Sequence, residues 1–306
     1  GNRYQRGCRE AAKAPERHII KGGQKMLKLS ICAETVYRHE NFERRIGKIS
    51  ENGMDTIEFW QWHDKNLKEI HDVLKQNHVN LLGFCVDSRN PKISEAISKT
   101  ALNTDTADVL LKAVSESIET AKYFGTKNLI ITVGDNIGGL SYERQIKNVV
   151  RNLNLIKGYF EKEKITLLVE PINLSERSSY LIPNVKTLIP IIEEVSSEYV
   201  KILYDIYHQG MESDFSTEGL KNTLPYVGHI HAADCPERGE PGTGNINYAD
   251  VFDMLGKEKY DKYIGLECLP KKPEEEIFQE LFTLCKLQKQ LNSSRTINLT
   301  FISSEF

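Results

Sequence analysis

The chain has 306 residues, a mass of 35.0 kDa, a formal net charge of -3 and a sequence pI near 6.3. This length fits either two ordinary domains or one α/β barrel, and 40% hydrophobic with 27% charged residues is typical of a globular chain with a sizeable core. The negative balance argues against a nucleic-acid or membrane-surface binder, and no apolar run approaches the roughly 18–20 residues of a spanning helix.

The two ends of the chain differ from the region between them. Residues 1–25 are basic and lack the apolar centre of a secretory signal, so we interpret them as an extension outside the fold, with a basic binding arm as the alternative. Residues 291–306 resemble a C-terminal tail. The six cysteines form no CxxC pair, which indicates reduced thiols and a cytoplasmic setting. These features leave residues 26–290 for the folded domain.

Short β-rich runs and helical patterns alternate along residues 26–290. The predicted strands are Leu27–Ala33, Thr56–Trp60, Val79–Val86, Asn128–Val133, Ile165–Glu170, Val200–Asp205, Gly228–Ala232 and Tyr263–Cys268. The predicted helices are Phe42–Asn52, Leu67–Gln76, Ala107–Phe124, Tyr142–Phe160, Val185–Glu194, Thr217–Thr223, Tyr248–Leu255 and Pro273–Leu291.

Strict alternation of nearly apolar strands with helices predicts a single-domain (β/α)8 TIM barrel. A doubly wound open sheet is the runner-up, but no GxGxxG or GxxxxGK[ST] motif follows any strand. The polar segment Arg89–Asp105, which contains Pro91, is predicted to be an active-site loop with its own short structure.

Acidic residues or a histidine end several predicted strands. Glu58 lies on the second, Glu170 on the fifth, Asp205 on the sixth, His231 on the seventh and Glu267 on the eighth. In a barrel these strand ends share the catalytic face. A single acid in such a place can simply cap the following helix, but the last four lie on neighbouring strands. Their three carboxylates would repel one another without a cation, so we predict a divalent metal site.

The predicted ligands are Glu170, Asp205, His231 and Glu267. Three carboxylates and one imidazole form a hard, oxygen-rich set, which favours Mn²⁺ or Mg²⁺ over structural Zn²⁺.

Further polar and aromatic residues follow the same strands. His208 is expected in the loop after Asp205, and Arg238 lies in the loop after the seventh strand, where its planar guanidinium suits a carboxylate or oxyanion. Of the group Phe59, Trp60, Trp62 and His63, we expect Phe59 in the core. Trp60 and His63 are expected at the substrate pocket, with Trp62 as an alternative wall.

Five segments resemble the xylose-isomerase-like barrel superfamily and, within it, the hydroxypyruvate isomerase family. They are Leu167–Asn173 (LLVEPIN), Tyr204–His208 (YDIYH), Gly228–Asp234 (GHIHAAD), Pro236–Tyr248 (PERGEPGTGNINY) and Gly265–Glu267 (GLE). The resemblance runs from about Met26 to about Leu287, and its most specific part is EPGTGNINY.

The resemblance implies a metal-assisted aldose–ketose type isomerase that converts hydroxypyruvate to tartronate semialdehyde through an enediolate. It implies Glu170 and Glu267 as the acid–base pair that also touches the metal, with Asp205 and His231 completing the coordination. His208 and Arg238 would hold the small-molecule substrate, an oxo-acid or ketose. The family often has glutamine in place of His231, whereas related ketose 3-epimerases use histidine, which leaves the substrate open.

Several rival functions share this barrel. A ketose 3-epimerase or another sugar isomerase would use the same metal and glutamates, and inosose-type dehydration is a third activity. A catalytically silent sugar-binding barrel belongs to a different class and would have no reason to retain an ion. A DNA-repair nuclease would need more histidines and a basic face. We therefore expect no nucleic-acid or membrane partner, and we expect a homo-oligomer because such barrels commonly associate.

Overall fold

Eight parallel strands close into a barrel in the computed structural model, which describes residues 27–285. The strands are β1 Lys28–Cys32, β2 Thr56–Glu58, β3 Asn80–Cys85, β4 Asn128–Thr132, β5 Thr166–Glu170, β6 Val200–Asp205, β7 Val227–Ala232 and β8 Tyr263–Leu266. They follow chain order around the barrel, and β8 pairs with β1 to close it. The predicted (β/α)8 TIM barrel is confirmed, whereas the predicted extension 1–25 and tail 291–306 lie outside the described residues.

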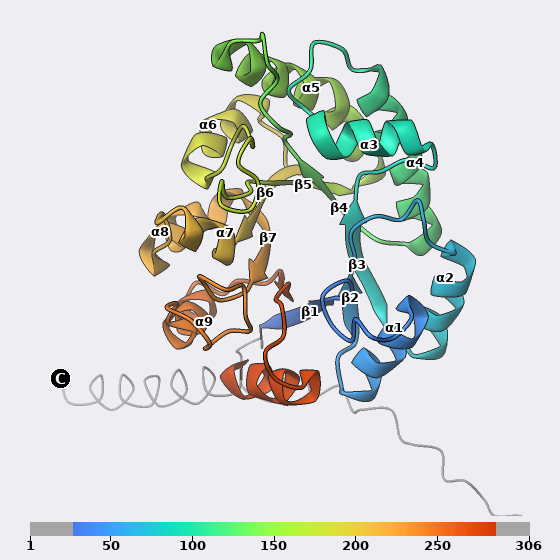
Figure 1. The fold of residues 1–306 in the computed structure, drawn as a ribbon, viewed down its shortest axis with the longest axis vertical. Helices are drawn as coiled ribbons and strands as arrows, with labels where there is room; N and C mark the ends of the chain where they lie inside the picture. The colour runs from blue at the N-terminus through green and yellow to red at the C-terminus, as the bar shows by residue number, and fades with distance from the viewer. Residues whose placement is uncertain (1–26, 286–306) are drawn as a thin grey trace, which may run out of the picture.

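At least one helix follows each strand, and the helices surround the ring of strands (Figure 1). They are α1 Phe42–Glu51, α2 Leu67–Gln76, α3 Pro91–Thr100, α4 Asp108–Phe124, α5 Tyr142–Glu163, α6 Val185–Val195, α7 Ile206–Met211, α8 Thr217–Thr223 and α9 Tyr248–Lys257. After β8 the chain is helical over residues 274–285. None of the helices in this part of the chain combines the length and apolar character needed to cross a membrane.

Two short helices were not predicted as such. The expected loop Arg89–Asp105 contains α3, which begins with Asn90 as a side-chain cap and Pro91 at its first position, a common start for a helix. The segment around His208, for which no helix was predicted, is α7, which follows β6 directly. Both helices lie after the carboxyl end of a strand and therefore at the face of the barrel where side chains from several strands meet.

The apolar core has two parts. A large cluster of buried side chains fills the space between the strands and the helices, and Phe59 belongs to it, as expected. A small separate cluster consists of Ile130 on β4, Leu168 on β5 and Leu203 on β6. Their neighbours along each strand, such as Leu167 and Val169, belong to the large cluster. Because side chains alternate across a strand, those of the small cluster point into the barrel and fill its interior. The polar residues at the strand ends therefore lie at the mouth of a packed cylinder.

Gly265 on β8 makes room for the polar side chains inside the barrel. A methyl group at this position would collide with Glu58 Oε1 and would lie 2.9 Å from both His229 Nε2 and His231 Cδ2. We expect Gly265→Ala to lower the free energy of unfolding by about 1–3 kcal/mol, the usual cost of overpacking a rigid interior. Urea unfolding followed by circular dichroism measures this.

Gly158→Ala is the matched control, because Gly158 lies inside α5 with no atom within 4 Å of the added methyl group. It should raise the free energy of unfolding by roughly 0.5–1 kcal/mol, since alanine is the better helix former. Equal unfolding midpoints for Gly265→Ala and the unchanged protein would show that the interior is not packed as described.

Candidate active site and metal centre

The structure brings the four predicted ligands together at the carboxyl ends of β5 to β8. Glu170 and Asp205 end β5 and β6, His231 is the last residue but one of β7, and Glu267 follows β8 directly. One ligand atom of each side chain lies within 4.8 Å of the others, and all four residues are buried. We refer to Glu170, Asp205, His231 and Glu267 as the four-residue cluster.

Two atoms of the four-residue cluster are buried without a hydrogen-bond partner among residues 27–285: Asp205 Oδ2 and His231 Nδ1. His231 Nδ1 lies 3.3 Å from Glu267 Oε2 and 3.7 Å from Glu170 Oε1. Buried polar atoms normally have a partner, and an unpaired carboxylate oxygen beside two further carboxylates is costly. A divalent cation would satisfy both atoms at once, so the donor set fits a metal ion.

Asp205 has two roles, one for each carboxylate oxygen. Its Oδ1 accepts the backbone N–H groups of Tyr207 at 2.8 Å and His208 at 3.3 Å, and so caps α7. Its Oδ2 faces the cluster, 3.5 Å from His208 Nε2. The two alternatives considered for a strand-end acid, helix cap and ligand, therefore describe the same side chain.

Glu58 and His229 lie directly beneath His231, and neither was in the predicted site. His231 Nε2 lies 3.1 Å from Glu58 Oε2, and His229 Nε2 lies 3.0 Å from the same oxygen. Burial opposes the ionised form of Glu58, yet the two histidines lower the pKa of its carboxyl well below the usual range. A carboxylate at Nε2 fixes the proton there and leaves Nδ1 free as a ligand, the common arrangement of metal-binding histidines.

The two glutamates of the cluster differ in electrostatic environment. Burial, reinforced by the negative charge of Glu267, raises the pKa of Glu170. Burial also opposes ionisation of Glu267, but His231, Arg238 and a hydrogen bond from Trp60 lower its pKa well below the usual range. Glu267 is therefore held as a carboxylate, while Glu170 takes up a proton more readily. A pair of carboxyl groups with opposed pKa shifts can divide acid and base roles.

The surroundings of His231 favour its protonated form when no cation is bound. Burial disfavours its charged form, but the carboxylates of Glu58 and Glu267 raise its pKa well above the usual value. A metal ion at Nδ1 must displace that proton, so metal affinity should fall as the pH falls.

His208 points its Nε2 into the cluster, 4.0 Å from Glu170 Oε1. Its Nδ1 lies 2.7 Å from Asn173 Nδ2. Asn173 Oδ1 accepts the backbone N–H of Glu176, so the amide nitrogen must be the atom that faces His208. Nδ1 is therefore an acceptor, and His208 presents an Nε2–H donor toward the site.

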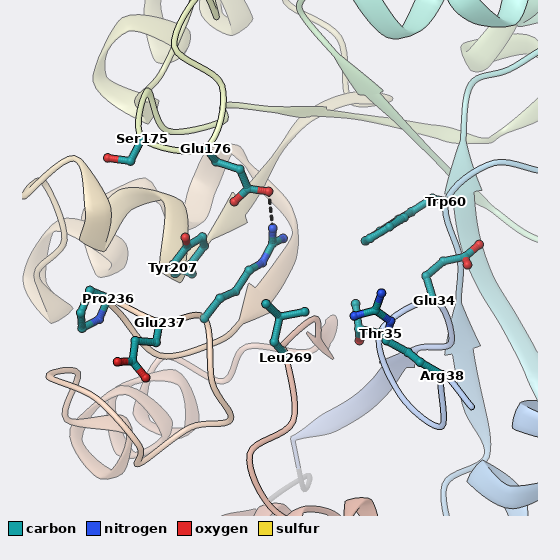
Figure 2. A pocket seen from close by; sticks show the side chains of 11 residues that line it. Glu34, Thr35, Arg38, Trp60, Ser175, Glu176, Tyr207, Pro236, Glu237 and Leu269 are labelled. Atoms are coloured by element: carbon teal, nitrogen blue, oxygen red, sulfur yellow. Dashed lines mark hydrogen bonds and ion pairs between the residues drawn. The ribbon is translucent and has the colours of Figure 1, made fainter. Parts of the chain in front are cut away.

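Arg238 and Trp60 connect the cluster to a cavity of about 460 Å³. Arg238 Nη2 donates to Glu267 Oε2 at 2.6 Å, and Trp60 Nε1 donates to Glu267 Oε1 at 2.5 Å. Arg238 Nη1 donates to Glu176 Oε1 at 2.5 Å, and Figure 2 shows Glu176 and Trp60 on opposite sides of the cavity. Trp60 is 38% exposed, whereas Trp62 is buried in the core. Trp60 is therefore the tryptophan that can contact a substrate.

His63, which the sequence analysis placed at the substrate pocket, lies outside the lining of this cavity. Its Nδ1 lies 2.6 Å from Asp87 Oδ2 and 3.2 Å from Ser94 Oγ. The cavity instead contains Glu176 and Tyr207, which the sequence prediction did not include. The guanidinium of Arg238 stacks over the ring of Tyr207, 5.0 Å from its centroid.

Family models, curated relatives and solved structures all match this chain to barrel proteins. The family model described as xylose isomerase-like TIM barrel matches residues 46–287. Hydroxypyruvate isomerase of Escherichia coli is 29% identical over 246 residues, which cover 80% of this chain and 94% of that protein. The 2-oxo-tetronate isomerase of Cupriavidus necator is 28% identical over 159 residues, covering 52% of this chain and 61% of that protein.

Solved structures share the fold at lower identity. The AP endonuclease, family 2, of Brucella melitensis superimposes with a TM-score of 0.75 at 22% identity, covering 82% of this chain and 96% of that one. An L-ribulose 3-epimerase superimposes with a TM-score of 0.69 at 15% identity, covering 90% and 98%. At these identities the two matches establish the barrel alone.

Proposed function

We propose a reaction on the premise that this chain belongs to the xylose isomerase-like TIM barrel family, whose model matches most of its length. The proposed activity is a metal-assisted aldose–ketose type isomerisation of a small oxo-acid, hydroxypyruvate to tartronate semialdehyde. The observation that carries it is the four-residue cluster: two glutamates with opposed pKa shifts stand beside two unpaired ligand atoms below a cavity.

The proposed ligands of the ion are Glu170, Asp205, His231 and Glu267, and the proposed ion is Mn²⁺ or Mg²⁺. Their three carboxylates and one imidazole form a donor set that suits hard cations. When bound, the ion supplies Lewis-acid stabilisation of the charge that develops on the substrate oxygens.

The glutamates carry the proton. In the direction from hydroxypyruvate, one of the two glutamates removes a proton from the hydroxymethyl carbon. The other delivers a proton to the former carbonyl carbon of the enediolate. The hydroxyl proton passes to the neighbouring oxygen, so the product has the same atoms as the substrate. The two roles exchange in the reverse direction.

Other side chains hold the substrate in this scheme. His208 presents its Nε2–H donor beside Glu170 and Asp205, where a substrate oxygen would lie. Arg238 lies at the cavity edge of the cluster and faces the carboxylate of a three-carbon acid. Trp60 forms the opposite wall of the cavity, and His63, which does not line the cavity, has no role in this scheme.

A ketose 3-epimerase is the second candidate, and one observation favours it. His231 stands where the hydroxypyruvate isomerase family often has glutamine, and an imidazole nitrogen is the stronger metal ligand. The same glutamates and ion would serve an epimerase, which needs a proton removed and returned at one carbon. A silent sugar-binding barrel is disfavoured because it has no use for unpaired ligand atoms at the base of its cavity.

The proposed function is tested by incubating the Mn²⁺-loaded protein in deuterium oxide with three- to six-carbon oxo-acids and ketoses. We expect hydroxypyruvate to yield tartronate semialdehyde with deuterium at the former carbonyl carbon, detected by NMR. Epimerised ketose with no conversion of any oxo-acid would replace the proposal with the epimerase. No product from any substrate, together with retained metal, would reject both.

The proposed setting is the cytoplasm, with a small-molecule substrate and a homo-oligomeric assembly. Five cysteines in the described region are free thiols, four of them buried and one partly buried, as expected in a reducing compartment.

A further inference from the structure

Within the described part of the chain, one of the five charged side chains that line the cavity has no oppositely charged partner. The five are Glu34, Arg38, Glu176, Glu237 and Arg238. Each of the three glutamates has a cationic partner: Glu34 is 2.7 Å from Lys65, Glu176 is 2.5 Å from Arg238, and Glu237 pairs with Lys271. Arg238 is bonded at both ends, to Glu176 and to Glu267. Among residues 27–285, Arg38 is the cavity-lining charge without an ion pair.

The loop that carries Arg38 is held firmly. Arg45 on α1 donates to the backbone carbonyls of Ala33, Glu34, Arg38 and Glu40 and so fixes the turn between β1 and α1. The residue before Arg38, Tyr37, is buried in a left-handed conformation with φ 47°. Its backbone N–H donates to Glu274 at 2.7 Å. The backbone under Arg38 is therefore anchored on two sides, which limits the positions its side chain can reach.

Figure 2 shows the guanidinium of Arg38 pointing into the cavity beside Thr35, across from Glu176 and Tyr207. Arg238 lies beside the four-residue cluster, where the proposed function places the carboxylate of a three-carbon acid, and it shares its donors with Glu176 and Glu267. It is therefore not the partner of a carboxylate at the remote end of the cavity. Arg38 offers a complete guanidinium fork, whose geometry matches a carboxylate.

The cavity is large for a three-carbon acid. Cavities of roughly 300–1,000 Å³ bury drug-sized ligands, and this one measures about 460 Å³. A substrate whose reacting carbons lie at the four-residue cluster therefore has room for additional carbons toward Arg38.

We propose that Arg38 is a specificity-determining residue that binds a carboxylate at the end of the substrate remote from the four-residue cluster. The substrate class then extends from three-carbon acids to longer sugar acids, and neutral ketoses are disfavoured. This inference rests on the proposed function in one respect, that the cavity receives the reacting substrate.

The test measures binding and needs no turnover. D-Gluconate and D-glucitol have six carbons each and lack the ketone or aldehyde group needed for reaction. They differ in that gluconate has a carboxylate where glucitol has a hydroxymethyl group. Calorimetry with Mn²⁺-loaded protein should show gluconate bound at least about ten-fold more tightly than glucitol. Arg38→Gln should weaken gluconate by about 10–100-fold, the range of a charge-assisted hydrogen bond, and leave glucitol within two-fold. Arg38→Lys should recover part of the loss.

Arg44→Gln is the matched control, because Arg44 is an exposed arginine of the same segment that does not line the cavity. It should change neither affinity. Equal losses of gluconate and glucitol in Arg38→Gln would show that Arg38 only shapes the cavity. Unchanged gluconate binding would place the carboxylate at the cluster or at Arg238. Either result overturns the assignment.

The two proposals can fail separately. If the unchanged protein isomerises no oxo-acid but Arg38→Gln loses gluconate affinity as predicted, the proposed reaction is wrong and the carboxylate site stands. If hydroxypyruvate is isomerised and Arg38→Gln binds gluconate normally, the reaction stands and the role of Arg38 is wrong.

Discussion

Glutamine in place of either Glu170 or Glu267 should lower kcat for the isomerase reaction by about 10²–10⁴-fold, the usual contribution of a positioned acid or base. The amide cannot accept or deliver the proton, and it is also a weaker metal ligand than a carboxylate, so the variants are compared at saturating Mn²⁺. Under that condition substrate affinity should change much less than kcat. Steady-state kinetics with hydroxypyruvate measures both quantities.

Exchange with solvent deuterium separates the two glutamates. The variant that lacks the acid keeps the base, so the hydroxymethyl carbon should still exchange its proton although no product forms. The variant that lacks the base should lose both exchange and product. Glu143→Gln, at the exposed start of α5, is the control and should behave as the unchanged protein. Near-normal turnover in both site variants would refute the assignment of the acid–base pair.

Removal of the metal should abolish the reaction and loosen the fold. A metal ion stabilises developing charge by several kcal/mol, so the chelated protein should lose roughly 10³-fold or more in rate. The buried carboxylates of the four-residue cluster also lose their counter-ion. At 100 times its dissociation constant an ion adds about 2.7 kcal/mol to the free energy of unfolding, which corresponds to a Tm about 5–10 °C higher than that of the metal-free protein.

Re-addition of Mn²⁺ or Mg²⁺ should restore the rate and Tm, whereas Ca²⁺ tests whether the site discriminates by ion size. Restoration should be less effective at low pH, because the ion competes with the proton on His231. Full activity after exhaustive chelation, with metal analysis showing none bound, would remove the ion from the mechanism.

The barrel could be predicted because two local signals agree along the chain. Apolar runs mark the strands and residues at helical spacing mark the helices, and the predicted bounds of the helix Leu67–Gln76 are those observed. The four-residue cluster followed from topology: neighbouring parallel strands end on the same face, so their terminal side chains meet. No contact between distant residues had to be guessed.

Other parts of the site depend on contacts between segments that are far apart in the sequence, and no local pattern predicts those contacts. Glu58 was recognised as a strand-end acid but not as the support of His231, although His229 and His231 share one face of β7. The helix α7 was missed although a strand-end acid was considered as a possible helix cap, because its six residues are too few to show helical periodicity. The cap Asn90 and Pro91 could have predicted α3.

The position of Arg38 in the cavity could not be predicted from the sequence. Arg38 is an exposed arginine in a polar loop, and nothing near it in sequence distinguishes it from other surface arginines. Its place in the cavity arises because Arg45 and Glu274 fix the turn that carries it. The pairing of the other cavity charges likewise depends on loops after β2, β5 and β8. Only the folded arrangement shows which charge has no partner.

Titration of the metal-free protein with Mn²⁺, with the free ion followed by electron paramagnetic resonance, tests most directly whether one cation joins Glu170, Asp205, His231 and Glu267. We predict one tight site per chain, weakened at least about 100-fold by Asp205→Asn, which keeps the α7 cap through its side-chain oxygen but removes the charge at Oδ2. A protein with no saturable site, or a site that Asp205→Asn leaves unchanged, would contradict this account.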